Sequence, residues 1–116
     1  MLAKNSQNEN DNDENLQEKL REIKGQEGII GYILRGQKSA AIDLKDPTKI
    51  IEYAVFSSAV FDISQNMTDT LQVGEVDTIV VESEKTKLLS MNVNDQRLSI
   101  FMEKSVDHNK LYNELK

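Results

Sequence analysis

The longest run of helix-spaced apolar residues in the chain lies between Asp46 and Gly74. Aspartate can cap a helix, Pro47 suits the first helical turn, and glycine commonly follows a helix end. Between these signals, apolar residues recur at three- and four-residue steps, which places them on one stripe. The stripe consists of Phe56, Val60, Ile63, Met67 and Leu71. The pattern predicts a long amphipathic helix over residues 47–72 that lies on a sheet.

The first half of this predicted helix has more apolar residues than one stripe needs. A second line contains Ile50, Ala54 and Phe61, and a third contains Ile51 and Val55. A helix that is apolar nearly all round is normally buried nearly all round. In a chain of 116 residues, one sheet cannot cover two faces of a peripheral helix. We therefore expect a second chain to cover the surplus face, although periodicity does not say which face meets the sheet.

Five segments have the pattern of β-strands. Residues 28–35 are almost continuously apolar, which predicts a central strand with a bulge or a closely packed helix at Gly31. A tight turn with Gly36 at positive φ leads to residues 39–44, whose shorter and more polar pattern predicts an edge strand. Residues 76–82, 87–93 and 97–102 are β-branched or alternating segments between short polar turns. Such turns require antiparallel neighbours.

Two short helices are predicted at the ends of this arrangement. Residues 15–24 have a narrow apolar stripe that stops at Gly25, and Ser105 can cap a weak helix that runs to Leu115. The element order is helix, two strands, long helix, three strands, helix. It predicts a single α+β domain with one five-stranded antiparallel sheet. We expect the two short helices on one face of the sheet and the long helix on the other.

Composition separates a polar N-terminal segment from this domain. Residues 1–15 are dominated by Asn, Asp, Glu and Gln, so we expect a disordered or frayed tail before a domain at residues 16–116. Asp11, Asp13 and Asn15 of this segment, with Glu22 further on, have the ligand spacing of a calcium-binding EF-hand loop. The turn glycine of such a loop is replaced by Leu16, so a solvated acidic tail is the better interpretation.

Charge and residue content argue against several functions. The net charge of −6 and the dispersed basic residues disfavour nucleic-acid binding, and no apolar run has the length of a membrane span. The absence of cysteine fits a cytoplasmic setting. His108 is the only histidine; it adjoins Asp107 on a helix, where neighbouring side chains diverge, so a surface histidine is favoured over an acid–base pair. We expect no cofactor, no metal and no enzymatic activity.

Several segments resemble the roadblock family, which is related to dynein light chains and to regulators of Ras-like GTPases. The resemblance covers about residues 16–115. It is carried by residues 28–34 (Gly-Ile-Ile-Gly-Tyr-Ile-Leu), 54–59 (Ala-Val-Phe-Ser-Ser-Ala), 73–82 (Val-Gly-Glu-Val-Asp-Thr-Ile-Val-Val-Glu), and the closing strand and helix. The first turn differs, because family members often have Asp-Gly where this chain has Arg35-Gly36-Gln37-Lys38.

The resemblance implies a homodimer in which the strand after the long helix pairs edge to edge with its copy, while the two long helices lie side by side. The surplus apolar face of the long helix likewise predicts a second copy of the chain as its partner. The predicted interface residues are Ile50, Ile51, Ala54, Val55, Ser58, Phe61, Val76, Thr78, Val80 and Glu82.

The resemblance also implies a function for the paired helices, namely binding of a Ras-like GTPase by a non-enzymatic scaffold or regulator. The predicted partner-binding residues are Ser57, Ser58, Phe61 and Gln65. Two alternatives remain open. One is a structural, light-chain-like subunit of a larger motor or protein assembly that binds a peptide or partner domain. The other, less favoured, is an enzyme of unrecognised type.

Overall fold

The computed structural model describes residues 14–37, 39–72, 74 and 76–115. Residues 14–24 are helical and are called the N-terminal helix below. The predicted tail therefore lies almost entirely outside the described residues. The remaining elements are β1 (Ile29–Arg35), β2 (Ala40–Leu44), the short 3₁₀ helix η1 (Pro47–Lys49), α2 (Ile50–Leu71), β3 (Thr78–Glu82), β4 (Thr86–Val93), β5 (Gln96–Glu103) and α3 (His108–Leu115).

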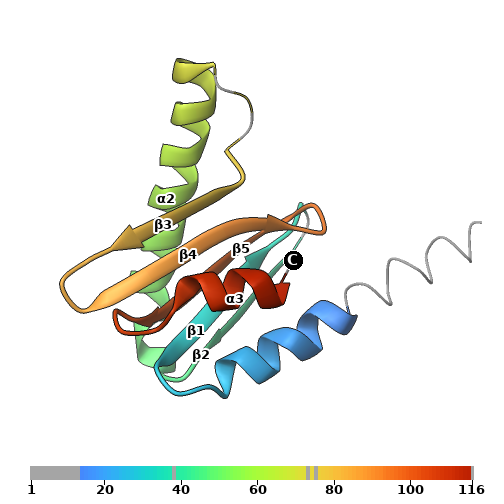
Figure 1. The fold of residues 1–116 in the computed structure, drawn as a ribbon, viewed down its shortest axis with the longest axis vertical. Helices are drawn as coiled ribbons and strands as arrows, with labels where there is room; N and C mark the ends of the chain where they lie inside the picture. Colours follow the sequence, from blue (N-terminus) through green and yellow to red (C-terminus); the bar gives the residue numbers. More distant parts are fainter. Residues whose placement is uncertain (1–13, 38, 73, 75, 116) are drawn as a thin grey trace, which may run out of the picture.

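The five strands form one antiparallel sheet in the order β2-β1-β5-β4-β3, which confirms the predicted α+β architecture (Figure 1). Strands β2 and β3 are the two edges, and β5 lies at the centre. The β4–β5 hairpin has a two-residue turn, because Val93 pairs with Gln96 and only Asn94 and Asp95 lie between them. Both turn residues have positive φ, 51° and 61°, the backbone that two-residue hairpins favour.

Helices cover both faces of the sheet, and the two cores are unequal. The N-terminal helix and α3 share one face, as predicted, and α2 lies alone on the other (Figure 1). The core under the two short helices is the larger one; it contains Leu16, Leu20, Ile23, Leu89, Met91, Leu98, Ile100, Met102, Leu111 and Leu115. The core under α2 is built around Ile33, Leu44, Val60, Leu88 and Phe101. Helix α2 is therefore held by the smaller of the two apolar cores.

The structure confirms the bulge predicted at Gly31 but not the positive φ predicted at Gly36. Gly31 has φ of 156° at a register shift between β1 and β5, so the predicted bulge is present. A side chain there would meet Asp43 O at 2.4 Å, so the close neighbour is strand β2 and not a helix. Gly36 does not have the predicted positive φ. The reason is that the loop is four residues long and is closed by a hydrogen bond from Gly36 N to Ser39 O of 2.8 Å.

The helix ends also differ in detail from the sequence signals. Asp46 does act as a cap, with Oδ1 accepting from Thr48 N at 3.1 Å, but the first turn is η1 and not α-helix. At the other end of α2, Gln72 adopts the left-handed conformation, so the helix stops before Gly74. The predicted cap Ser105 is wrong for α3. Asp107 caps it instead, because its Oδ1 accepts from the backbone two residues on, Asn109 N, at 3.0 Å.

Candidate partner-binding surface and cavity

Helix α2 contacts the sheet through a narrower face than the sequence predicted. Its buried residues are Ser57, Val60 and Ser64. Of the predicted sheet-facing stripe, Val60 is buried and Phe56 is half-buried. The other three members, Ile63, Met67 and Leu71, are 50%, 39% and 57% exposed. This part of the prediction is wrong because the second half of α2, which carries these three residues, runs past the sheet (Figure 1).

The exposed side of α2 has a continuous line of apolar residues, which we call the exposed row. Its members follow one another at steps of four, so each lies roughly 40° around the helix from the one before, and the row winds around about half of the helix. Ile51 and Val55 are the most exposed, at 78% and 65%. The row consists of Ile51, Val55, Ala59, Ile63, Met67 and Leu71.

The other predicted interface residues lie in three different environments. On α2, Ala54, Ser58 and Phe61 are half-buried against their own chain, while Ile50 is exposed at the start of the helix. On β3, Val80 pairs with Leu89, whose side chain belongs to the core on the α3 side. By strand alternation, Thr78 and Glu82 share that face, opposite α2. Val76 precedes the strand. The structure therefore does not gather the ten residues into one patch.

Strand β3 has a free edge, as predicted. Among the described residues it pairs with β4 alone, and Val80 is 37% exposed. Ile79 and Val81 pack toward α2. A short strand of β-branched residues with one open edge can accept another strand by main-chain hydrogen bonding.

Beneath α2 the sheet presents a layer of buried polar side chains that the sequence did not predict. Ser57 Oγ and Ser99 Oγ are 2.9 Å apart, and both residues are buried. Arg97 is also buried; its Nε donates to Ser90 Oγ at 2.9 Å and its Nη2 to Ser64 Oγ at 3.5 Å. The alternation of residues 97–102 already put Arg97, Ser99 and Phe101 on one face of the sheet. What it did not say is that this face lies under α2.

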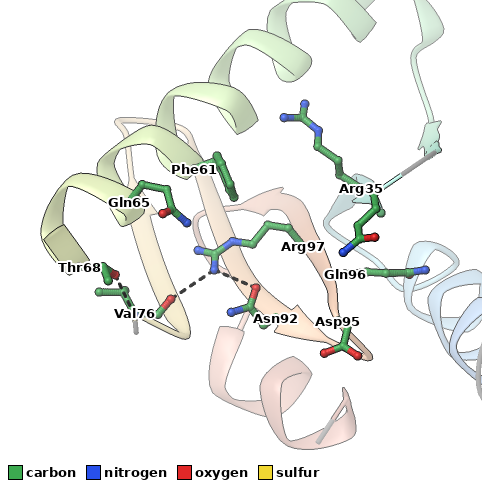
Figure 2. A pocket seen from close by; sticks show the side chains of 11 residues that line it. Arg35, Phe61, Gln65, Thr68, Val76, Asn92, Asp95, Gln96 and Arg97 are labelled. Carbon is green, nitrogen blue, oxygen red and sulfur yellow. Dashed lines mark hydrogen bonds between the residues drawn. The ribbon is translucent and has the colours of Figure 1, made fainter. Parts of the chain in front are cut away.

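A cavity of about 550 Å³ opens between the flank of α2 and the ends of strands β1 and β5 (Figure 2). Arg35 and Arg97 extend toward α2 from these two strands, and Phe61 and Gln65 line the cavity from the helix. Arg35 Nη2 donates to Ser58 Oγ at 3.3 Å. Two of the four predicted partner-binding residues, Phe61 and Gln65, therefore line this cavity, and Ser58 contacts its Arg35. Ser57 is buried against the sheet.

On the opposite face, the electrostatics of one buried tyrosine are perturbed. Burial raises the pKa of the Tyr32 phenol, and the negative charge of Asp43 raises it further. Asp43 itself forms an ion pair with Lys24 of the N-terminal helix. This pair connects the N-terminal helix to edge strand β2.

The part of the chain that the structure describes contains no group of side chains that could hold a metal ion. There, no three His, Asp or Glu residues lie close enough to hold a metal, and no helix is long and apolar enough to cross a membrane. The EF-hand interpretation also fails for residues 14–22, which are helical and do not form a loop. His108 is half-buried, and its Nδ1 has no hydrogen-bond partner among the described residues, so it is less exposed than predicted.

Comparison with known proteins agrees with the architecture. The sequence matches no protein-family model and none of the curated proteins. Among solved structures, the chain is similar to a Roadblock/LC7 domain from Streptomyces avermitilis, with a TM-score of 0.60 and 17% sequence identity. The match covers 76% of this chain and 77% of the other. The sheet order, the two-sided helix arrangement and this likeness together show that the chain has the roadblock fold.

Proposed function

We propose that this protein is a non-enzymatic, homodimeric, cytoplasmic scaffold or regulator that binds a Ras-like small GTPase through paired α2 helices. The observation that carries the proposal is the exposed row on α2. Six exposed apolar residues that follow one another at four-residue steps are unusual for a surface that only meets water, and contiguous apolar surface of this kind marks interaction sites.

The position of the exposed row supports self-association in particular. The row continues along the second half of α2, which projects beyond its own sheet (Figure 1). Strand β3 follows α2 directly in the sequence, and its open edge leaves backbone N–H and C=O groups available to a partner strand. A copy that added its own β3 to this edge would extend the sheet, and its α2 could cover the exposed row. This refines the interface predicted from the sequence, because Ile63, Met67 and Leu71 replace the half-buried Ala54, Ser58 and Phe61.

The dimer is tested by light scattering after size-exclusion chromatography over about a hundredfold range of concentration. Ile63→Glu places a charge in the middle of the exposed row, at a position that is already 50% exposed, so folding should survive. We expect the variant to shift to monomer. The matched control is Asn109→Glu on α3, which adds the same charge on the far side of the sheet and should leave the dimer intact. A monomeric wild-type protein at every concentration contradicts the dimer.

The GTPase is tested separately, with the purified full chain as bait for small GTPases loaded with GTP or with GDP. We expect one nucleotide state to be retained preferentially, because a regulator acts through its differential affinity for the two states. Phe61→Ser, at the α2 flank, should weaken retention more than Asn109→Glu. Recovery of one large assembly irrespective of nucleotide supports the light-chain-like alternative and contradicts the GTPase proposal.

A further inference from the structure

We propose that the cavity beside α2 binds a small organic anion, a carboxylate or phosphate group on a compact apolar body, with the anionic group at Arg35 and the body against Phe61. This inference goes beyond the proposed scaffold function and does not depend on it. The dimer needs the exposed row and the β3 edge, whereas the anion site needs only the cavity, which shares Phe61 and Gln65 with the predicted GTPase-binding residues.

The volume of the cavity favours a small-molecule ligand over a single acidic side chain of a partner protein as its occupant. About 550 Å³ lies within the usual range of small-molecule sites, roughly 300–1,000 Å³. It is several times the volume of an aspartate or glutamate side chain, so one acidic side chain of a partner would leave most of it unfilled. A compact organic molecule fits the space better.

Arg35 supplies the charge that selects an anion. Its guanidinium has five N–H donors, and its one hydrogen bond to the described residues is the 3.3 Å bond to the neutral Ser58 hydroxyl. The residue is half-buried, so water screens its charge less than at an open surface. No described carboxylate forms an ion pair with it. A guanidinium in this state is suited to a planar carboxylate or a phosphate, which it can hold through two parallel hydrogen bonds.

The rest of the cavity wall suits the body of such a ligand. Phe61 offers an aromatic surface from α2, and Gln65 and Asn92 offer carboxamides (Figure 2). Arg97 and Asp95 also line the cavity, with opposite charges, and the position of Arg97 is fixed because Nη1 donates to Asn92 Oδ1 at 3.3 Å and to Asp77 O at 3.4 Å. Arg35 therefore supplies the positive charge for the ligand. One apolar surface with a few convergent polar groups is the usual composition of a small-ligand site.

The test is a titration of the ¹⁵N-labelled full chain, followed by ¹H–¹⁵N correlation spectra. The probes are phenyl phosphate and benzoate, which combine an anion with a ring, inorganic phosphate, which has the anion alone, and phenol, which has the ring alone. We expect saturable shifts with phenyl phosphate or benzoate at the amides of Gly36, Phe61, Gln65 and Arg97 and at Arg35 Nε. The two single-feature probes should bind at least about tenfold more weakly.

Two variants connect the binding to the cavity. Arg35→Gln should weaken the better probe about tenfold or more, because it removes a charge-assisted hydrogen bond. Gln65→Trp starts from an exposed helix position and fills the cavity without changing charge, so it should also reduce binding. The control is Lys85→Gln, which removes one positive charge from the exposed β3–β4 turn and should leave binding unchanged.

The proposal is overturned if none of the probes gives saturable shifts at cavity residues below about 10 mM. It is equally overturned if Arg35→Gln and Gln65→Trp, each shown to be folded by a dispersed spectrum, bind the probe as tightly as Lys85→Gln. Neither result bears on the dimer, which is measured without any probe.

Discussion

At the scale of single residues, the unexpected feature is the number of polar side chains in the interior. Ser57, Ser64, Ser90, Arg97 and Ser99 are all buried between α2 and the sheet. A buried polar group costs free energy unless it is hydrogen-bonded, and the bonds among these residues meet that requirement. Ser57 therefore stabilises the fold, although the sequence alone suggested a surface role for it.

The Ser57–Ser99 contact is open to a double-mutant cycle. Ser57→Ala or Ser99→Ala alone should lower the free energy of unfolding by about 1–2 kcal/mol, because each leaves the other hydroxyl buried without its partner. The double variant should cost less than the sum of the two. Urea unfolding of the four proteins measures this. Additive losses would mean that the 2.9 Å contact contributes nothing beyond the individual side chains.

The raised pKa of Tyr32 predicts that the free energy of unfolding falls at alkaline pH. Its pKa in the folded protein is raised above the ordinary value of 10.0, so the neutral phenol is favoured by folding. The contribution is fully present below pH 10.0 and is lost as the pH rises through the folded pKa. Tyr32→Phe cannot ionise and should lose less stability between about pH 8 and about pH 11 in urea unfolding. An identical loss in both proteins would contradict the assignment to Tyr32.

At the scale of elements, capping and turn chemistry were partly readable from the sequence. The short turns correctly predicted antiparallel neighbours, and Asp46 correctly marked the start of the long helical segment. The end of α2 was predicted to within one residue, whereas the cap of α3 was misplaced, because several residues could serve and the choice depends on where the chain leaves the core.

The β4–β5 turn gives a test at this scale. Asp95 has φ of 61°, where glycine has no steric cost. Asp95→Gly creates the Asn-Gly pair that two-residue hairpins prefer, so it should raise the free energy of unfolding, by about 0.5–1 kcal/mol. Asp95→Ala is the control and should lower it by on the order of 1 kcal/mol. Thermal or urea unfolding measures both, and a destabilised glycine variant would contradict the turn assignment.

At the scale of the whole molecule, the two faces of the sheet are unequal, and so are its two edges. The larger core lies under the N-terminal helix and α3, whereas α2 is held by fewer buried apolar residues and a polar layer. An element of that kind gains stability when a second surface covers it. The same molecule offers β2 and β3 as competing edges for a partner strand.

Hydrogen exchange at low and high protein concentration separates these edges. If the proposed dimer forms through β3 and α2, amides in residues 78–82 and in the second half of α2 should become more protected as concentration rises. Those of β2, residues 40–44, should not change. Concentration-dependent protection in β2 alone would place the interface on the opposite edge of the sheet.

Much of this protein was determined by the sequence by itself. The periods of its apolar residues specified the element types and the two-sided helix arrangement, and its short turns specified the antiparallel sheet, because period and turn length are local properties of the chain. The resemblance to the roadblock family was likewise visible before the fold.

Only the tertiary structure decided which side of α2 is exposed. Periodicity gives the angles between residues around a helix, but the absolute orientation depends on which residues the sheet accommodates. Here the sheet presents Ser99 to Ser57 and Arg97 to Ser64, whereas Ile63, Met67 and Leu71 are exposed because the second half of α2 runs past the sheet. The cavity at Arg35 also needed the fold, since its walls come from segments far apart in the sequence.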